Sequence, residues 1–311
     1  LSYGHGMGFK SAGLTASVWG RPLRVVIDPD LAQAPDTILA AQIDAKADVS
    51  DLLAWQAVEM PLPLGGITAV SVAVNVADDI SVGISSELRG VTVDMPLPWG
   101  KSAQTSAPLQ VIWRDRDWAA WEIFWFGRFS AVVDTPDLDQ LAAHLDVTPR
   151  TRPPKSIGMS PKPGLSVTGY LPSLDLADWE HFIKPLSGSS STLAVPARAQ
   201  DLRISRLLWK GQELGSLNIN LRSDADQLQM DLDLPWLGAT YSQERRMGVT
   251  ETDGGVNAPT QRILRLTRLD LDGLPQFGNG LVDGQLPDPE SGIGRWMRQL
   301  PAEIERARRG S

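Results

Sequence analysis

Two short motifs hold residue types that could support phosphate binding or catalysis. The segment Gly4-His5-Gly6-Met7-Gly8 is rich in glycine. No helix pattern follows it, however, and a dinucleotide site needs a strand, a turn and a helix in succession. The segment from Gly164 to Gly169 is close to a nucleophile elbow, but its second glycine comes one residue too late and Ser166 falls inside a strand pattern. Neither motif predicts a catalytic or phosphate site.

A cluster near the middle of the chain holds residue types that could bind a metal ion, namely Asp175, Asp178, Glu180 and His181. Nothing in the sequence supplies a matched second pair of ligands. Acidic residues are also favoured in the first turn of a helix, because they interact with its dipole. A helix start is therefore the preferred interpretation, and we predict no metal and no other cofactor.

Two pairs of carboxylates have the composition of a glycosidase site, which needs a general acid and a second carboxylate. They are Asp231 with Asp233, and Asp270 with Asp272. Each pair lies at positions i and i+2 opposite an apolar face, so a solvated sheet face explains it better. We therefore predict that the chain is not an enzyme.

The composition is that of an ordinary globular chain with an acidic balance. Its 311 residues are 42% hydrophobic and 21% charged, and the net charge is −8. An acidic chain repels phosphate backbones, so we expect no nucleic-acid partner. The sequence has no Cys, which excludes disulfides and thiol nucleophiles, and no apolar run long enough to span a bilayer. It begins at Leu1 without a leader-like stretch, and we expect a fragment of a longer precursor.

Alternation of the β type recurs along most of the chain. Between Thr68 and Val76, four valines share one face, and Ala, Ser and Asn residues share the other. The segments 217–221 and 228–234 repeat this pattern. An apolar face opposite a polar face is typical of an antiparallel sheet that is wetted on one side. Further strands are expected over 13–19, 23–28, 38–48, 80–85, 91–95, 109–114, 118–125, 129–134, 165–170, 202–209, 239–243 and 263–271.

Helical signals are few. The N-terminal signal Thr135-Pro136-Asp137 predicts a helix over 138–145, with Thr135 as the cap. Ser50 and Asp51 could cap another short helix over 52–58, and 175–183 is a third candidate. The last is an amphipathic helix over 293–304, which Pro301 breaks or kinks.

The apolar faces are the most informative feature of the sequence. Residues 118–126 are apolar on both faces except at Glu122. A core strand is the ordinary explanation, and a wall that meets hydrocarbon is the functional one. Each methylene withdrawn from water is worth about 0.8 kcal/mol, so a curved apolar sheet could shelter acyl chains without any catalytic residue. The candidate lining residues are Val70, Val72, Val74, Val76, Trp121, Ile123, Trp125, Leu217, Ile219, Leu221, Leu228, Met230 and Leu232.

Three segments, in order, carry a family resemblance. The stretch from Ser86 to Leu109 contains S-x-L-x-G, P-x-P, K-x-A and P-L in succession. The segment 164–175 with Trp179 reads G-x-x-x-x-G-x-L-P-x-L-D…W, and 202–215 reads L…G-x-x-L-G. This succession resembles the YhdP-type branch of the AsmA-like family. Residues 1–85 fit more loosely, and the region from Gly248 onward has no clear match.

The resemblance implies a bridge-like lipid-transfer protein of the Gram-negative envelope. It implies a periplasmic location, an inner-membrane anchor in the full-length protein, and passive conduction of phospholipid between the inner and outer membranes. The implied partners are phospholipid acyl chains. Because this chain carries no anchor, we expect an internal or late fragment.

The expected fold is mainly β, an elongated and curved antiparallel sheet that forms a hydrophobic groove, with a few short α-helices. Residues 1–146 and 165–272 are expected as two β-groove segments. Between them, 147–164 reads as a Pro-rich linker or loop, and 273–311 as a loop-rich tail with a short amphipathic helix.

Two other functions stay open. The same apolar faces could form the closed core of a β-sandwich that serves as a non-catalytic scaffold or adhesion module. Alternatively, exposed tryptophans such as Trp99 or Trp236 could bind carbohydrate together with the paired Asp residues.

Overall fold

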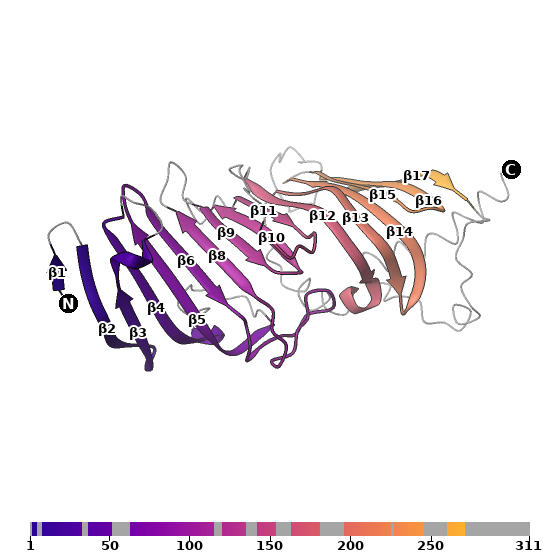
Figure 1. Ribbon diagram of the computed structural model, residues 1–311. Coiled ribbons are helices and arrows are strands. Elements are labelled where there is room, and N and C mark those ends of the chain that lie inside the picture. The colour runs from indigo at the N-terminus through magenta and orange to yellow at the C-terminus, as the bar shows by residue number, and fades with distance from the viewer. Residues whose placement is uncertain are drawn as a thin grey trace, which may run out of the picture.

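A computed structural model describes residues 2–4, 8–32, 37–51, 63–114, 120–134, 142–153, 163–180, 196–224, 227–245 and 260–270. Seventeen strands form one sheet over these ranges. Figure 1 shows them side by side in an elongated layer, with β1 and β17 at opposite ends. A mainly β fold built on an elongated, antiparallel-rich sheet is therefore confirmed.

The strands fall close to the segments expected from alternation. They are β1 (Ser2–Gly4), β2 (Gly8–Val18), β3 (Arg21–Ile27), β4 (Leu39–Asp48), β5 (Leu64–Val76), β6 (Ile80–Ser86), β7 (Val91–Val93), β8 (Leu109–Arg114), β9 (Ala120–Trp125), β10 (Phe129–Asp134), β11 (Ala142–Asp146), β12 (Gly164–Asp175), β13 (Ala197–Trp209), β14 (Gln212–Ser223), β15 (Gln227–Asp233), β16 (Leu237–Arg245) and β17 (Thr260–Leu269). Pairing follows chain order, except that β6 pairs with β8 while β7 pairs with the first residues of β5. A 3-10 turn (Pro29–Leu31) and helical residues at 49–51 and 176–180 complete the described structure.

Two neighbouring strand pairs are parallel, β11 with β12 and β12 with β13. A parallel pair cannot be closed by a tight turn and needs a long crossover. Residues 147–163 make the first of these connections, and Gly164, the last residue of the predicted Pro-rich segment, already belongs to β12. The first residue of the segment, Val147, is only 1% exposed, so the segment starts in the core rather than as a wholly exposed linker. Whether the chain divides at this segment into separate units stays a prediction.

The prediction of a helix over 138–145 is wrong for residues 142–145, because they belong to strand β11 (Ala142–Asp146). This strand pairs with β10 on one side and β12 on the other. Two ladders of hydrogen bonds outweigh a local capping signal. The helix expected over 175–183 is present at 176–180. The segments 52–58 and 293–304 lie wholly outside the described residues.

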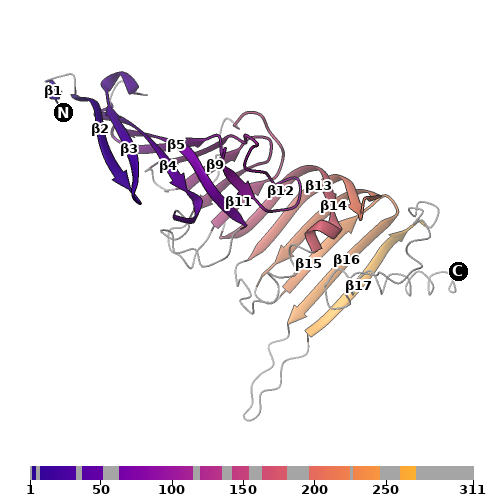
Figure 2. The same cartoon turned by 90° about the horizontal axis from the view of Figure 1, so that it is seen from below.

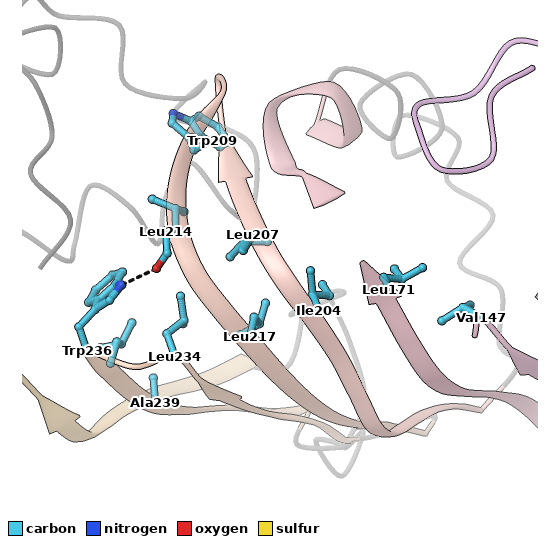
Figure 3. Packing of buried hydrophobic residues seen from close by; sticks show 11 residues of the cluster. Val147, Leu171, Ile204, Leu207, Trp209, Leu214, Leu217, Leu234, Trp236 and Ala239 are labelled. Atoms are coloured by element: carbon cyan, nitrogen blue, oxygen red, sulfur yellow. Dashed lines mark hydrogen bonds between the residues drawn. The ribbon is translucent and has the colours of Figure 1, made fainter. Parts of the chain in front are cut away.

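The larger buried cluster lies toward the C-terminal half of the sheet, on strands β12 to β16 (Figure 3). Ile204 and Leu237 are essentially inaccessible to solvent. The indole of Trp236 is buried here too, and its Nε1 donates a 2.8 Å hydrogen bond to the Leu214 carbonyl. Trp236 is therefore a core residue, which removes it from the proposed carbohydrate surface. The described strands form a single sheet, and no second sheet faces it within those residues.

Candidate functional site

One face of the sheet carries an unbroken row of apolar residues from β2 to β17, called here the apolar row. Residues directly opposite each other on paired strands project from the same face. The register therefore places one residue of each strand beside its neighbour in the next. The row is Leu14, Val25, Ile43, Val72, Ile84, Val111, Ile123, Ala131, Leu145, Val167, Ala199, Leu221, Met230, Tyr241 and Leu264.

Adjacent rows on the same face are also apolar. One runs through Ile27, Ala41, Val74, Val82, Trp113, Trp121, Val133, Ala143, Leu165 and Ala197. Another, toward β17, runs through Leu202, Ile219, Leu232, Ala239 and Leu266. Because alternate residues of a strand share a face, the register brings all the lining residues predicted from the sequence to this one face. Whether they contact lipid is a separate question.

The opposite face is polar along the same strands. Beside the apolar row, its successive partners are Thr15, Arg24, Asp44, Ser71, Ser85, Gln110, Phe124, Ser130, Asp146, Thr168 and Gln200. Phe124 is the one large apolar member of this series. Toward β17 the polar face continues through Asn220, Asp231, Thr240 and Arg265. The sheet is amphipathic over most of its described width. The exception is β8 to β10, where Ile112, Phe124 and the fully buried Val132 lie on the opposite face.

Within the described ranges, no second layer covers the large side chains of the apolar row. Its two buried members are the alanines Ala131 and Ala199, whereas every larger side chain keeps partial solvent exposure. Leu14 is 43% exposed, and Trp121 in the adjacent row is 37% exposed. Figure 2, seen from below, shows the strands continuing as one layer from β2 to β17. Apolar surface that is left partly open in this way is typical of a binding surface rather than of a finished core.

The lower edge of the sheet in Figure 1 is bridged on the apolar side by two segments distant in the sequence. The rings of Trp99 and Trp179 meet edge to face, with centroids 5.0 Å apart. Trp179 Nε1 also donates to the carbonyl of Leu97 at 3.3 Å. Trp99 and helical residues Leu176 and Ala177 pack against the larger core cluster. The loop after β7 is thereby joined to the helix after β12.

Asp175 acts as a helix cap in this bridge. Its Oδ1 accepts hydrogen bonds from the backbone N–H of Ala177 at 3.0 Å and Lys210 at 3.1 Å. Its Oδ2 accepts from Gly211 N–H at 2.9 Å. The carboxylate therefore fixes both the helix start and the β13–β14 turn. Among the described residues, no group of three or more His, Asp or Glu side chains is placed to hold a metal ion, and His181 lies outside them.

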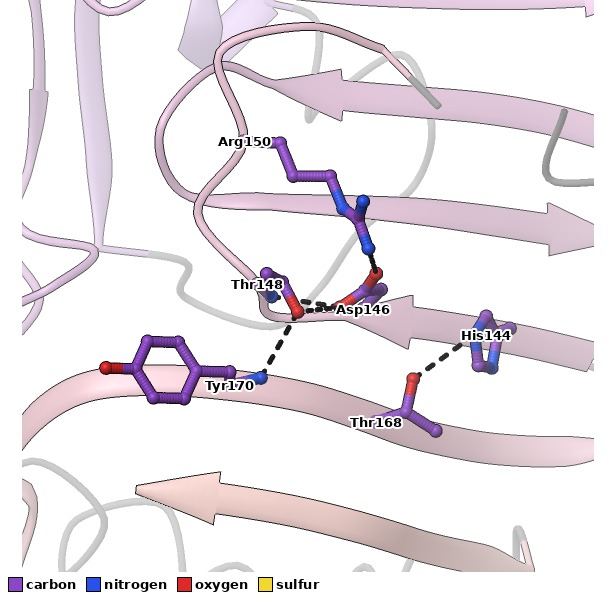
Figure 4. A network of polar contacts seen from close by, with 6 residues as sticks. All are labelled: His144, Asp146, Thr148, Arg150, Thr168 and Tyr170. Atoms are coloured by element: carbon purple, nitrogen blue, oxygen red, sulfur yellow. Dashed lines mark hydrogen bonds and ion pairs between the residues drawn. The ribbon is translucent and has the colours of Figure 1, made fainter. Parts of the chain in front are cut away.

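A polar network stabilises the crossover after β11 (Figure 4). Asp146 accepts hydrogen bonds from the backbone N–H and the hydroxyl of Thr148, at 3.0 and 2.5 Å, and pairs with Arg150 at 3.0 Å. Burial alone would raise the pKa of Asp146, but these hydrogen bonds and the Arg150 charge outweigh it and lower the pKa. Gly169 packs directly against this carboxylate, with a φ of +113°, and a Cβ there would overlap Asp146 Oδ1.

Ser166 lies on the polar face near an imidazole, but without the partners of a catalytic serine. His144 Nδ1 is 3.4 Å from the Ser166 hydroxyl, and its Nε2 is 3.4 Å from the hydroxyl of Thr168 rather than from a carboxylate. Asp231 accepts from Thr240, and Asp233 pairs with Arg268. These groups stabilise the polar face, and none of these described contacts sets up a general acid and base.

Three features of the apolar side were not predicted as sites. They are the Trp99–Trp179 contact, the buried ammonium of Lys101, and Arg128 stacked on Trp125 with its guanidinium carbon 4.9 Å from the ring centroid. The Trp99–Trp179 contact joins segments distant in the sequence, and the Lys101 and Arg128 side chains belong to loops and turns. Alternation within one strand contains no information about such contacts. The lone signal was that Trp99, Lys101 and Trp179 belong to the segments of the family resemblance.

A comparison with protein-family models matches the family described as YhdP protein, over residues 5–258. No curated protein and no solved structure matches the chain. None of the described helical segments is long and apolar enough to cross a bilayer.

Proposed function

The chain belongs to the YhdP protein family, and on that premise we propose that it binds phospholipid by its acyl chains and conducts it along the apolar face of its sheet. Conduction is passive and runs across the periplasm between the inner and outer membranes. The anchor to the inner membrane is a feature of the full-length protein. The role is non-enzymatic and needs no cofactor.

The observation that carries this proposal is the apolar row. Neighbouring strands lie about 4.8 Å apart, so the row from β2 to β17 extends about 70 Å along the sheet. The hydrocarbon core of a bilayer is about 30 Å thick, so each acyl chain reaches about 15 Å. The row is several times longer than a lipid tail and has no charged member. A lipid moving along it exchanges one apolar neighbour for another, so no single position of the row holds its acyl chains tightly.

Energetics favour the same function. Each methylene withdrawn from water contributes about 0.8 kcal/mol, so even partial cover of two chains offsets much of the cost of removing a lipid from a membrane. The predicted lining residues, from Val70 to Leu232, all project from this face. We propose that the partly exposed ones form the floor of a hydrophobic groove, with the Trp99–Trp179 bridge along its lower edge. Trp125 and Leu217 are buried in the two core clusters and support this floor from within.

The test compares a charge on one face with the same charge on the other. Val72→Asp places a carboxylate in the apolar row, where an unpaired charge against hydrocarbon is costly. Ala73→Asp, the matched control, places it one residue later on the polar face. Native mass spectrometry of delipidated protein reloaded from phospholipid vesicles should show lipid on the wild type and the control. We expect Val72→Asp and Ile219→Asp each to lower the number of phospholipids bound at saturation, because each charge removes part of the row.

Two results would contradict the proposal. Equal lipid loading of Val72→Asp and Ala73→Asp would show that the apolar row is not the path. A wild-type chain that takes up no phospholipid would instead favour a non-catalytic envelope scaffold. Circular dichroism of each variant checks that the sheet is intact.

A further inference from the structure

Arg128 lies at the lower edge of the apolar face, in the turn between β9 and β10. The turn is closed by a 3.0 Å hydrogen bond from Arg128 N–H to the Trp125 carbonyl. The guanidinium then folds back over the Trp125 indole, with its carbon 4.9 Å from the ring centroid. Trp125 shares a face with Ile123 of the apolar row, because the two are alternate residues of β9. The cation therefore lies on the apolar side of the sheet.

No carboxylate within the described part of the chain lies at ion-pair distance from Arg128. Five other arginines are paired with acids in that part of the chain: Arg21, Arg114, Arg150, Arg206 and Arg268. Arg24, Arg198, Arg222 and Arg265 belong by register to the polar face, where water solvates them. Arg128 differs from both sets, since it is partly buried beside apolar side chains.

A second cation lies close enough to act on Arg128. Burial lowers the pKa of Lys101, and repulsion from Arg128 lowers it further. The three N–H donors of Lys101 are all used by the carbonyls of Leu88, Val91 and Ser102. The guanidinium of Arg128 has no such acceptor among the described residues. Its N–H groups are therefore available, beside the positive charge of Lys101, to a ligand that is not part of the chain.

We propose that Arg128 binds the phosphate of a phospholipid whose acyl chains lie on the neighbouring apolar row. This inference rests on the function proposed above and adds a headgroup contact to it. A guanidinium binds a phosphate through two parallel N–H···O bonds, which a lysine cannot reproduce. Trp125 and Ile123 are two residues apart, or about 7 Å along the strand. A headgroup on Arg128 thus leaves its tails beside Ile123, Val111 and Ala131.

The experiment compares two lipids with identical tails. Delipidated protein is incubated with vesicles that contain either dioleoyl phosphatidylglycerol or dioleoylglycerol, which lacks the phosphate, and loading is read by native mass spectrometry. Arg128→Gln should weaken binding of the first phosphatidylglycerol about tenfold and leave binding of the first dioleoylglycerol unchanged, since a charged hydrogen-bonded pair is lost. Phosphatidylglycerol binding by Arg128→Lys should lie between that of the wild type and that of Arg128→Gln. Arg222→Gln removes the same charge from the polar face and should change neither.

The remaining outcomes separate this inference from the proposed function. If Arg128→Gln binds both lipids as well as the wild type does, Arg128 does not contact the headgroup. The proposed apolar path is unaffected by that result. If the variant loses both lipids equally, Arg128 only holds Trp125 in place, and the inference is again wrong. Should soluble glycerol phosphate bind the wild type as tightly and lose affinity in Arg128→Gln, the site takes free phosphate esters rather than lipid. A wild-type chain that takes up neither lipid overturns both proposals.

Discussion

Lys101 places a charged group in the interior, at 7% exposure. Its ammonium donates to the carbonyls of Leu88 and Val91 at 2.7 Å each, and to that of Ser102 at 3.0 Å. A buried charge is costly unless its hydrogen bonds are made, and here all three donors are used. The side chain thus ties β7 to the segments before and after it. At the residue scale, the residues of the family resemblance named here are architectural, whereas the residues that we propose to face lipid are mostly interchangeable aliphatic side chains.

Removing the ammonium of Lys101 should destabilise the fold. Lys101→Met keeps much of the side-chain volume but removes the ammonium from three carbonyls. Those of Leu88 and Ser102 keep backbone hydrogen bonds from Val91 and Thr105, at 3.2 Å each. We expect the free energy of unfolding to fall by about 2–3 kcal/mol, measured by urea unfolding. Lys46→Met, on the exposed polar face, is the matched control and should change the free energy by less than about 0.5 kcal/mol. Equal effects of the two substitutions would contradict the structural role of Lys101.

Asp146 should make stability depend on pH in the acid range. The pKa of its carboxyl is lower in the folded chain than the ordinary value of 3.8. The ionised form therefore contributes stability above that ordinary value, and the contribution is lost as the pH falls through the folded pKa. Asp146→Asn should cost about 1–3 kcal/mol near neutral pH and progressively less below about pH 4. Urea midpoints across this range test it, with Asp78→Asn in an exposed turn as the control. If the difference in unfolding free energy between the wild type and Asp146→Asn stays constant with pH, the Asp146 carboxylate does not cause the pH dependence.

At the element scale, alternation predicted most of the sheet because each strand has one apolar face. The segments 109–114 and 129–134 match β8 and β10 residue for residue. The strand β11 was missed because Thr135-Pro136-Asp137 favours a helix locally, whereas pairing with β10 and β12 depends on residues far away in the sequence. The parallel direction of β11 to β13 was missed for the same reason. The alternation within a segment predicts which residues share a face of the strand, but it does not predict which strands lie beside it.

Asp175 joins two elements, and its loss should affect both. Asp175→Ala removes the cap of the 176–180 helix and the acceptor for two N–H groups of the β13–β14 turn. We expect a loss of about 1–3 kcal/mol in the free energy of unfolding. Trp179 fluorescence should also change, because the helix positions that ring against Trp99. Asp178→Ala, exposed on the same helix, is the control, and an equal effect there would exclude a capping role.

At the scale of the whole molecule, the strand register aligns the apolar faces of separate strands into one continuous surface. Alternation predicts the lining residues one strand at a time, but their continuity depends on pairings from β2 to β17. A single shift by one residue between two strands would interrupt the row, because it moves a whole apolar set to the other face. The sites of Lys101, Arg128 and the Trp99–Trp179 bridge could not be predicted, since they arise where loops meet across that surface. Continuity also distinguishes a path from a local pocket.

A charge in the middle of the row should divide the path without abolishing binding. A row of about 70 Å has length for about four acyl chains of about 15 Å placed end to end. Native mass spectrometry of saturated wild-type protein should therefore show more than one phospholipid per chain. Ile123→Asp should lower the maximum occupancy while lipid still binds on both sides. Photocrosslinkers at Val72 and Met230, the first before Ile123 in the row and the second after it, should both continue to label lipid.

The control for this variant is Gln110→Asp, which puts the same charge on the polar face of the neighbouring strand and should leave the occupancy unchanged. A local pocket makes different predictions. It would bind one lipid in the wild type, and Ile123→Asp would either remove that lipid or have no effect. A wild-type occupancy that saturates at one phospholipid would thus contradict a continuous path, even if that lipid lies on the apolar face. Because movement along the row requires that neighbouring positions be equivalent, the number of bound lipids measures the property on which conduction depends.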